Sequence, residues 1–223
     1  MAKPRRGRPA AGPHLTVAAL VAAARELVRE EGVDRLSMRR LAARLGVDVS
    51  SLYWHVTSKE ALLDLVADDL LSEARWPDPA LPWRERLLGA LAEYRRLLLD
   101  HRDAARILAG RWVLGRNTLR SLEAMLSALL SAGLDTRAAA QVAFLLNSYV
   151  TGFVLQELSP MNSAEAEGAD PGEVLARMNA TLKALPADEF PSLVTAADDL
   201  TARTNDERFE RGVTLMLAGL TAL

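Results

Sequence analysis

The sequence predicts an all-α protein in two parts, and three observations lead to this prediction. The composition is rich in Ala, Leu and Arg, which favour helices, and only 5% of the residues are aromatic. Apolar residues recur at helical spacing, and no alternating pattern typical of strands is present. The stretch RWPDPALPW holds three prolines within residues 77–82, which marks a domain boundary. We expect a flexible arm at 1–14, a small helical domain at 15–74 and a larger one at 75–223.

The first part contains a long helix and then a short one. The apolar pattern from Leu15 predicts a helix that Thr16 could cap and Gly32 could end. Ser37 suits the N-cap of a short helix that Gly46 closes. The next two predicted helices also begin at residues that can cap a helix.

Asp48 can cap a second short helix that runs to about Val56. Thr57 and Glu60 have the spacing of a capping box, which predicts a longer helix to about residue 74. The remaining chain has amphipathic helical patterns at roughly 83–101, 103–112, 117–132, 136–158, 173–185, 190–202 and 206–222. The polar segment 159–172 between two of these patterns predicts a mobile loop.

Composition excludes several classes of protein. Half of the 223 residues are hydrophobic and a quarter are charged, which is typical of a globular protein. The chain has no cysteine, which excludes disulfides, thiolate catalysis and zinc sites with cysteine ligands. The start MAKPRRGRP lacks the apolar core of a signal peptide, and no apolar run approaches the roughly 18 residues of a membrane span. We therefore expect a cytoplasmic protein without a membrane partner.

The net charge of −2 conceals an asymmetry along the chain. Residues 1–60 hold 11 Lys/Arg against 6 Asp/Glu, a balance of +5, and the remaining residues hold 16 against 23, a balance of −7. A basic N-terminal part on an acidic body indicates a polyanion partner for the first part only, although chance variation could give the same asymmetry.

The two short helices and the tight turn between them have the plan of a helix-turn-helix, whose second helix enters the major groove of DNA. On the second helix Leu52 and Val56 lie four residues apart and face inward. The large side chains of Tyr53, Trp54 and His55 are then left to the other faces, where they could contact DNA.

The stretch SMRRLAARLGVDVSSLYWHVTSKEALLDLVADDLL resembles the DNA-binding domain of the tetracycline-repressor (TetR) family. WRERLLGALAEYRRLLLDHRDAARIL and LLNSYVTGFVLQ resemble the effector-domain helices of the same family. The resemblance covers nearly the whole chain, strongly over 36–71 and weakly over 159–205. It implies a homodimeric regulator, released from a palindromic operator in double-stranded DNA by a small organic effector.

The resemblance also implies roles for residues of the first domain. Arg39 matches an arginine that reads a guanine, a contact that a guanidinium makes with O6 and N7. Val49, Ser50 and Ser51 match base-contacting positions, while Tyr53, His55 and Lys59 match positions that bind phosphate. Ser37 and Trp54 complete the set of expected DNA contacts. Three alternatives stay open: Trp54 could pack on the first helix, His55 could be an ordinary surface histidine, and Arg39 with Arg40 could be a solvated pair.

The arm has a motif of its own. RRGRP, with Arg6 and Arg8, resembles the short arms that enter A·T minor grooves, whose width and potential attract arginine. The alternative is a basic tail that adds only non-specific affinity.

The second domain is expected to form a dimer and an effector pocket. The helices predicted at 136–158 and 206–222 are apolar on more than one face, which requires a second surface to cover them. In the family this pair of helices forms a four-helix bundle with its mate. The family positions of the pocket are occupied here by Tyr94, Leu108, Arg111, Trp112, Met125, Asn147, Thr151 and Gln156.

Two of these positions argue against a magnesium–tetracycline effector. Tetracycline-binding members hold the metal chelate through a histidine, with help from a glutamate, and those positions are Leu108 and Gln156 here. Leucine offers no metal ligand and glutamine lacks the charge that favours a hard cation. We therefore expect no metal and no cofactor, but a mostly apolar effector with a few hydrogen-bonding groups. Arg111 could meet an anionic group or form a surface ion pair.

Two other classes of function remain. The chain could be a constitutive or architectural DNA-binding dimer without a ligand. A helical-bundle enzyme is the weakest alternative, because the histidines lie far apart and the Glu-x-x-His pattern of di-iron bundles is missing.

Overall fold

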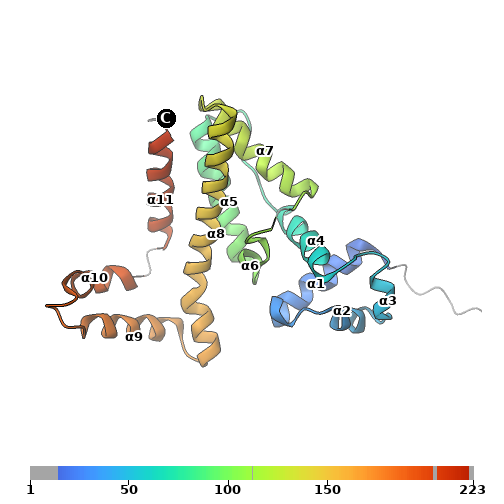
Figure 1. The fold of residues 1–223 in the computed structure, drawn as a ribbon, viewed down its shortest axis with the longest axis horizontal. Coiled ribbons are helices and arrows are strands. Elements are labelled where there is room, and N and C mark those ends of the chain that lie inside the picture. Colours follow the sequence, from blue (N-terminus) through green and yellow to red (C-terminus); the bar gives the residue numbers. More distant parts are fainter. Residues whose placement is uncertain (1–14, 112, 203–204, 221–223) are drawn as a thin grey trace, which may run out of the picture.

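The computed structural model describes residues 15–111, 113–202 and 205–220, apart from the side chains of 160–167. All regular structure in these ranges is helical, as the composition predicts. Figure 1 shows the long helix α8 (Thr136–Glu167) running vertically, across the longest axis of the molecule, through the larger part, which we call the body. The first four helices, which we call the head, lie on one side of the body (Figure 1).

The head contains α1 (Val17–Glu31), a 3-10 turn η1 (Val33–Arg35), α2 (Met38–Leu45), α3 (Val49–Leu52) and α4 (Lys59–Leu71). Thr16 caps α1 by accepting from the amide of Ala19, and the Ser37 hydroxyl caps α2 in the same way. Gly46 ends α2 in the left-handed conformation, with φ 65°. These three helix signals in the sequence are confirmed.

Two other helix signals were wrong. Asp48 precedes α3 but makes no side-chain capping bond, and α3 ends at Leu52. The amide of Val56 still donates to the carbonyl of Leu52, so the backbone stays coiled beyond the helix. Ser58, not Thr57, caps α4, where its hydroxyl accepts from the amide of Ala61 at 3.0 Å. Two adjacent hydroxyl residues suit a cap equally well, and only the path of the chain chooses between them.

The body contains α5 (Trp83–Asp100), α6 (Ala104–Leu108), α7 (Arg116–Ser131), α8, α9 (Pro171–Lys183), α10 (Pro191–Thr201) and α11 (Asn205–Gly219). Helices α5, α7 and α8 pack against one another around a leucine-rich core. Helices α9 and α10 pack together and extend away from the head (Figure 1). Helix α11 lies beside α8.

Helix α8 departs from the sequence expectation in two ways. It continues past Pro160 to Glu167, through the segment predicted as a loop, and the first break is Gly168 with φ 66°. Ala and Glu in the last turn, 164–167, favour the helix. Its stretch Thr136–Ser159 is also apolar and long enough to cross a membrane by length and composition, with 39% of that window buried inside the protein. Counting uninterrupted apolar runs missed this stretch. A helix with one apolar face in the core and another exposed meets the same criteria of length and composition.

Candidate DNA-binding face and effector site

The head presents the segment 49–55 as an outward ridge on a small core. Leu52 is fully buried and Val56 is 4% exposed, so the expected inward anchors are confirmed. Between them Tyr53 is 50% exposed and Trp54 is 89% exposed, and His55 is exposed as well. Trp54 therefore does not pack on the first helix. Large side chains that the head core does not use are available to a partner.

Arg39 and Arg40 differ in their contacts, although both are exposed on α2. Arg40 forms an ion pair with Glu31 at the end of α1. Arg39 has no ion pair among the residues that the structure describes, so its guanidinium is available for a bidentate contact. The intramolecular pairing of Arg40 distinguishes two adjacent arginines that the sequence left equivalent.

Lys59 is the first residue of α4, where unpaired amides and the helix dipole favour an anion. Its ammonium nitrogen lies 3.4 Å from the carbonyl oxygen of Val33 in η1. Ser50 is exposed, and Ser37, Val49 and Ser51 are partly exposed. Arg6 and Arg8 of the arm lie outside the described residues.

The expected effector residues are only partly brought together. The hydroxyl of Tyr94 on α5 lies 3.3 Å from that of Thr151 on α8, and both residues are buried. Burial disfavours the tyrosinate and raises the pKa of Tyr94, against the opposing effect of the Thr151 bond. Met125 is 7% exposed and belongs to the same core, and Leu108 packs against it. Four of the predicted residues therefore lie in or against the core.

The other predicted effector residues lie elsewhere or outside the description. Asn147 and Gln156 are exposed on α8. Arg111 forms an ion pair with Asp64 of α4, with 2.9 Å between the nitrogen and the oxygen, which favours the ion-pair interpretation of this residue. Trp112 lies outside the described residues. An open groove on α7, lined by Leu114, Leu119 and Leu122 among others, includes no residue of the expected pocket.

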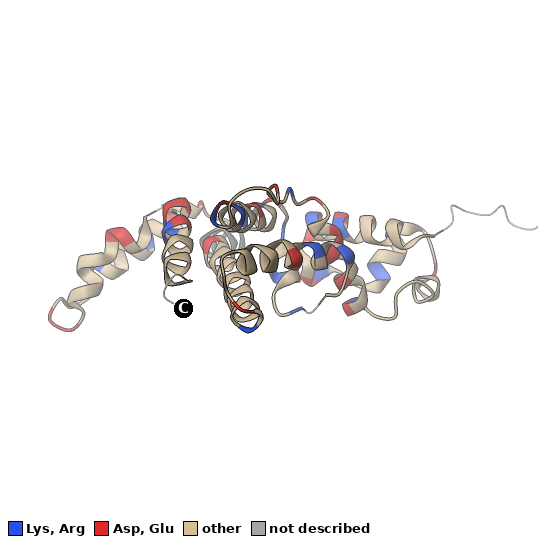
Figure 2. Cartoon of the chain, turned by 90° about the horizontal axis from the view of Figure 1, so that it is seen from above, with Lys and Arg blue, Asp and Glu red and all other residues tan. Residues whose placement is uncertain are grey.

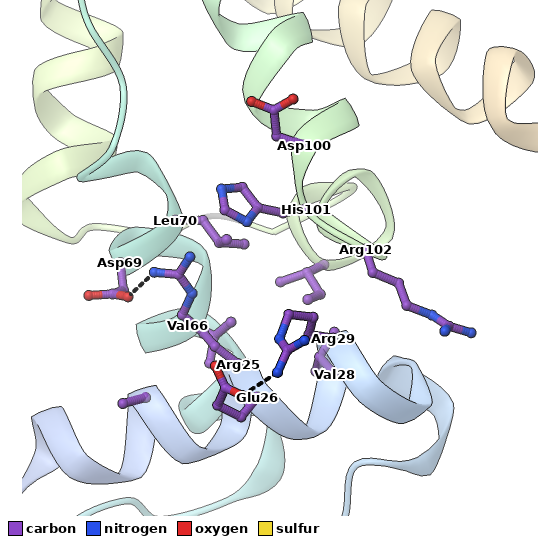
Figure 3. Close-up of a pocket in the computed structure, with 12 residues that line it drawn as sticks. Arg25, Glu26, Val28, Arg29, Val66, Asp69, Leu70, Asp100, His101 and Arg102 are labelled. Carbon is purple, nitrogen blue, oxygen red and sulfur yellow. Dashed lines mark hydrogen bonds and ion pairs between the residues drawn. The ribbon is translucent and has the colours of Figure 1, made fainter.

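A cavity of about 280 Å³ lies at the junction of head and body (Figure 3). Val28, Val66 and Ile107 contribute its apolar wall, and His101 points into it from the turn after α5. Arg25 of α1 lines it and forms ion pairs with Asp69 of α4 and with Glu73 just after the end of α4. No residue of the predicted effector pocket lines this cavity.

Ion pairs concentrate at the same junction, which sequence reasoning missed. His101 lies 3.0 Å from Glu73. Burial of Glu73 is the largest single effect and opposes its ionisation, but the hydrogen bonds and positive charges of Arg25 and His101 together outweigh burial and lower the pKa of Glu73. Asp68 accepts bonds of 3.0 and 2.9 Å from the first amides of α7, and thus caps a body helix from α4. The sequence signal that could have predicted these contacts is the set of acidic residues on α4, on the face opposite its apolar residues.

Two body helices leave apolar side chains exposed. Phe144 and Leu145 of α8 are 63% and 55% exposed, and Leu215 of α11 is 67% exposed. The sequence has no charged residue from 138 to 156 or from 212 to 223. Figure 2 shows these largely uncharged stretches and, by contrast, the mixed charges around the junction. In the single chain these two helices are therefore left with exposed apolar faces, as the sequence pattern predicts.

Comparison with known proteins identifies the family to which this architecture belongs. Residues 20–66 match the family described as bacterial regulatory proteins of the tetR family, and residues 76–223 match the tetracyclin repressor-like C-terminal domain. The chain belongs to the TetR family. It is therefore a helix-turn-helix transcriptional regulator with a tetracyclin repressor-like C-terminal domain.

Three TetR relatives illustrate the match. An HTH-type transcriptional regulator of Saccharopolyspora erythraea is 36% identical, over 94% of this chain and 86% of its own length. The class A tetracycline repressor from transposon 1721 of Escherichia coli is 34% identical, over 90% and 88%. The crystal structure of the TetR-family protein ActR of Streptomyces coelicolor with actinorhodin has a TM-score of 0.83 at 39% identity, covering 95% of this chain and 98% of that one.

Proposed function

We propose that this regulator is a homodimeric, cytoplasmic repressor that reads a palindromic operator through residues 49–55, Arg39 and Lys59. The observation that carries the proposal is the exposed ridge of Tyr53, Trp54 and His55, held on the head by the buried Leu52 and Val56. A twofold dimer through α8 and α11 covers the apolar faces of Phe144, Leu145 and Leu215. Two heads then meet half-sites about one helical turn apart, ~34–36 Å. The relatives are regulators, and we infer that this chain likewise acts by binding rather than by catalysis.

Selection of bound sequences from random DNA tests the operator model. We expect a palindromic motif, and a motif without twofold symmetry would contradict the docking of a dimer. Arg39→Ala should weaken binding by ~1–3 kcal/mol and relax the preference at one base position in each half-site. Arg40→Ala is the matched control, since Arg40 pairs with Glu31 within the head. Equal losses of base preference in the two variants would contradict the role of Arg39.

The effector is a mostly apolar organic molecule that binds beside Tyr94 and Thr151. Their hydroxyls would supply hydrogen bonds in an otherwise apolar core, and Leu108 supplies no metal ligand. We expect magnesium–tetracycline to leave the operator complex intact. Because the relative ActR is described with actinorhodin, a screen for release of the operator should begin with that compound. Release by magnesium–tetracycline, abolished by EDTA, would contradict the assignment of effector class.

A constitutive DNA-binding dimer is the second candidate function. The burial and direct contact of Tyr94 and Thr151 favour it, and no predicted effector residue lines the junction cavity or the open groove on α7. A compound that releases the operator from the wild type, but not from Tyr94→Phe/Thr151→Val, would exclude this candidate. Failure of a broad screen would support it.

A further inference from the structure

The carboxylate of Asp103 does not cap its own helix, α6, but accepts a hydrogen bond from the head. Asp103 is the N-cap residue of α6, yet its side chain makes no capping bond there. One carboxylate oxygen accepts from the amide of Val33 in the head at 2.7 Å, and the other accepts from Arg106 at 3.0 Å. Its φ of 60° is a positive value at a residue other than glycine, and its side chain is 14% exposed. The backbone thus adopts a strained conformation that aims this carboxylate at the head.

Val33 joins this body carboxylate to a predicted DNA contact. Its amide donates to Asp103, and its carbonyl accepts from the ammonium of Lys59 at 3.4 Å. Gly32, with φ 85°, lies so close that an added Cβ would sit 3.2 Å from the Asp103 carboxylate. The 3-10 turn is therefore bonded to Asp103 of the body through the amide of Val33, and it binds Lys59 of the head through the carbonyl of Val33.

Arg106 forms a second link between the body and the same turn. Its guanidinium bridges Asp103 and Asp34, with nitrogen–oxygen distances to Asp34 of 2.8 and 3.0 Å. The hydrogen bond from Arg106 lowers the pKa of Asp34, so Asp34 stays ionised and the bridge stays formed at neutral pH. Asp103 and Arg106 of the body therefore hold two consecutive residues of the turn.

We propose that Asp103 is a positioning residue for operator binding, because it fixes the turn whose carbonyl orients Lys59. An ammonium has three donors, so the bond to Val33 leaves two for a phosphate. A lysine that is already oriented loses less side-chain freedom when it meets DNA, which corresponds to about a 2- to 10-fold gain in affinity. This inference rests on the proposed function, which takes Lys59 as a phosphate contact.

A double-mutant cycle on the full-length protein tests the proposal. Asp103→Gly removes the carboxylate, and glycine tolerates the positive φ without strain. We expect it to weaken operator binding about 2- to 10-fold in a fluorescence-anisotropy titration. In a Lys59→Ala background the same substitution should change the affinity less than twofold, because the side chain it positions is gone. Asp103→Asn keeps a neutral acceptor and a residue suited to this φ, and should restore most of the affinity.

Salt dependence and two controls separate this role from a general loss of structure. The slope of log affinity against log salt should fall in Asp103→Gly, towards the slope of Lys59→Ala, which loses about 0.9 per lost contact. Arg96→Ala is the matched control, because it removes an exposed ion pair within α5 and should leave affinity and slope unchanged. Circular dichroism confirms that each variant is folded. If Asp103→Gly does not fold, Asp103→Ala, which also lacks the carboxylate, takes its place in the cycle.

Three outcomes would decide against the inference. Full wild-type affinity in Asp103→Gly would overturn it, as would a loss of the same size in the presence and absence of Lys59. If Lys59→Ala itself binds the operator with wild-type affinity, the proposed DNA face fails at that residue. That last result tests the proposed function separately from the role of Asp103, because it is obtained with Lys59→Ala alone.

Discussion

Replacing Arg95 by alanine should destabilise the body strongly. The guanidinium of Arg95, on α5, donates to both carboxylate oxygens of Glu157 on α8, at 3.0 and 2.6 Å. It also donates to Asp206 at the start of α11, at 2.7 Å. The same group lies 4.9 Å from the ring centre of Phe209 and 5.7 Å from that of Phe153. Arg95 thus joins three helices, including both that we assign to the dimer.

The magnitude follows from the burial of this pair. The side chains of Arg95 and Glu157 are each only 12% exposed, so alanine at 95 leaves a buried carboxylate without its partner. Loss of one partner from such a pair costs roughly 3–5 kcal/mol, and the lost cation–π contact favours the upper end. Asp206 is 85% exposed, and its bond adds little. For a chain of this size the expected loss lowers Tm by roughly 6–20 °C.

Urea unfolding followed by circular dichroism, at one fixed protein concentration, measures this loss. Arg96→Ala is the matched control, because Arg96 is the next residue and its side chain is 45% exposed, against 12% for Arg95. Of its partners, Asp100 is exposed, and Glu93 keeps a hydrogen bond from the amide of Arg75 when Arg96 is removed. It should cost less than about 1 kcal/mol. Replacing both Arg95 and Glu157 by methionine should recover most of the stability, since no charge is then left buried. If Arg95→Ala costs no more than Arg96→Ala, the reasoning from burial is refuted.

Three further predictions concern the ridge, α11 and the junction. Trp54→Ala should weaken operator binding in a titration while the free energy of unfolding changes by less than about 0.5 kcal/mol, and a larger loss of stability would show that Trp54 packs on the head. Gly212→Ala should cost about 1–3 kcal/mol, because the added Cβ would collide with the Tyr149 hydroxyl, whereas Gly219→Ala meets nothing within 4 Å in the single chain and should cost less in the same assay. Glu73 has a lowered pKa when folded, so its contribution to stability is present above the ordinary value of 4.5 and is lost as the pH falls through the lowered one. Glu73→Gln should therefore flatten the decline of Tm between about pH 5 and pH 3, and parallel declines would contradict the assignment.

Local signals identified most helices of this protein. The hydroxyl caps at Thr16 and Ser37 and the glycine at 46 are interactions within one turn of chain, so the sequence carries them directly. The ends of α3 and α8 were misplaced because several residues at each end suit both a helix and a turn. Packing against the rest of the chain then decides where the helix stops.

The exposed ridge that we propose to bind DNA was accessible from sequence for a similar reason. Leu52 and Val56 share one face by helical spacing, which leaves Tyr53, Trp54 and His55 outside whatever the rest of the fold does. The arrangement of the residues predicted for the effector pocket was not accessible in this way, since they come from separate helices. The structure buries Tyr94 and Thr151 together but leaves Asn147 and Gln156 exposed, which helix periodicity alone could not establish.

The sequence by itself determined the all-α fold, the helix-turn-helix and the ridge it presents, because each rests on residues a few positions apart. Only the tertiary structure decided which of two adjacent arginines is paired, and that Asp103 reaches the head. The amide of Val33 and the carboxylate of Asp103 are 70 residues apart in the chain. A bond over such a separation depends on how all the intervening helices pack, and no local pattern encodes it.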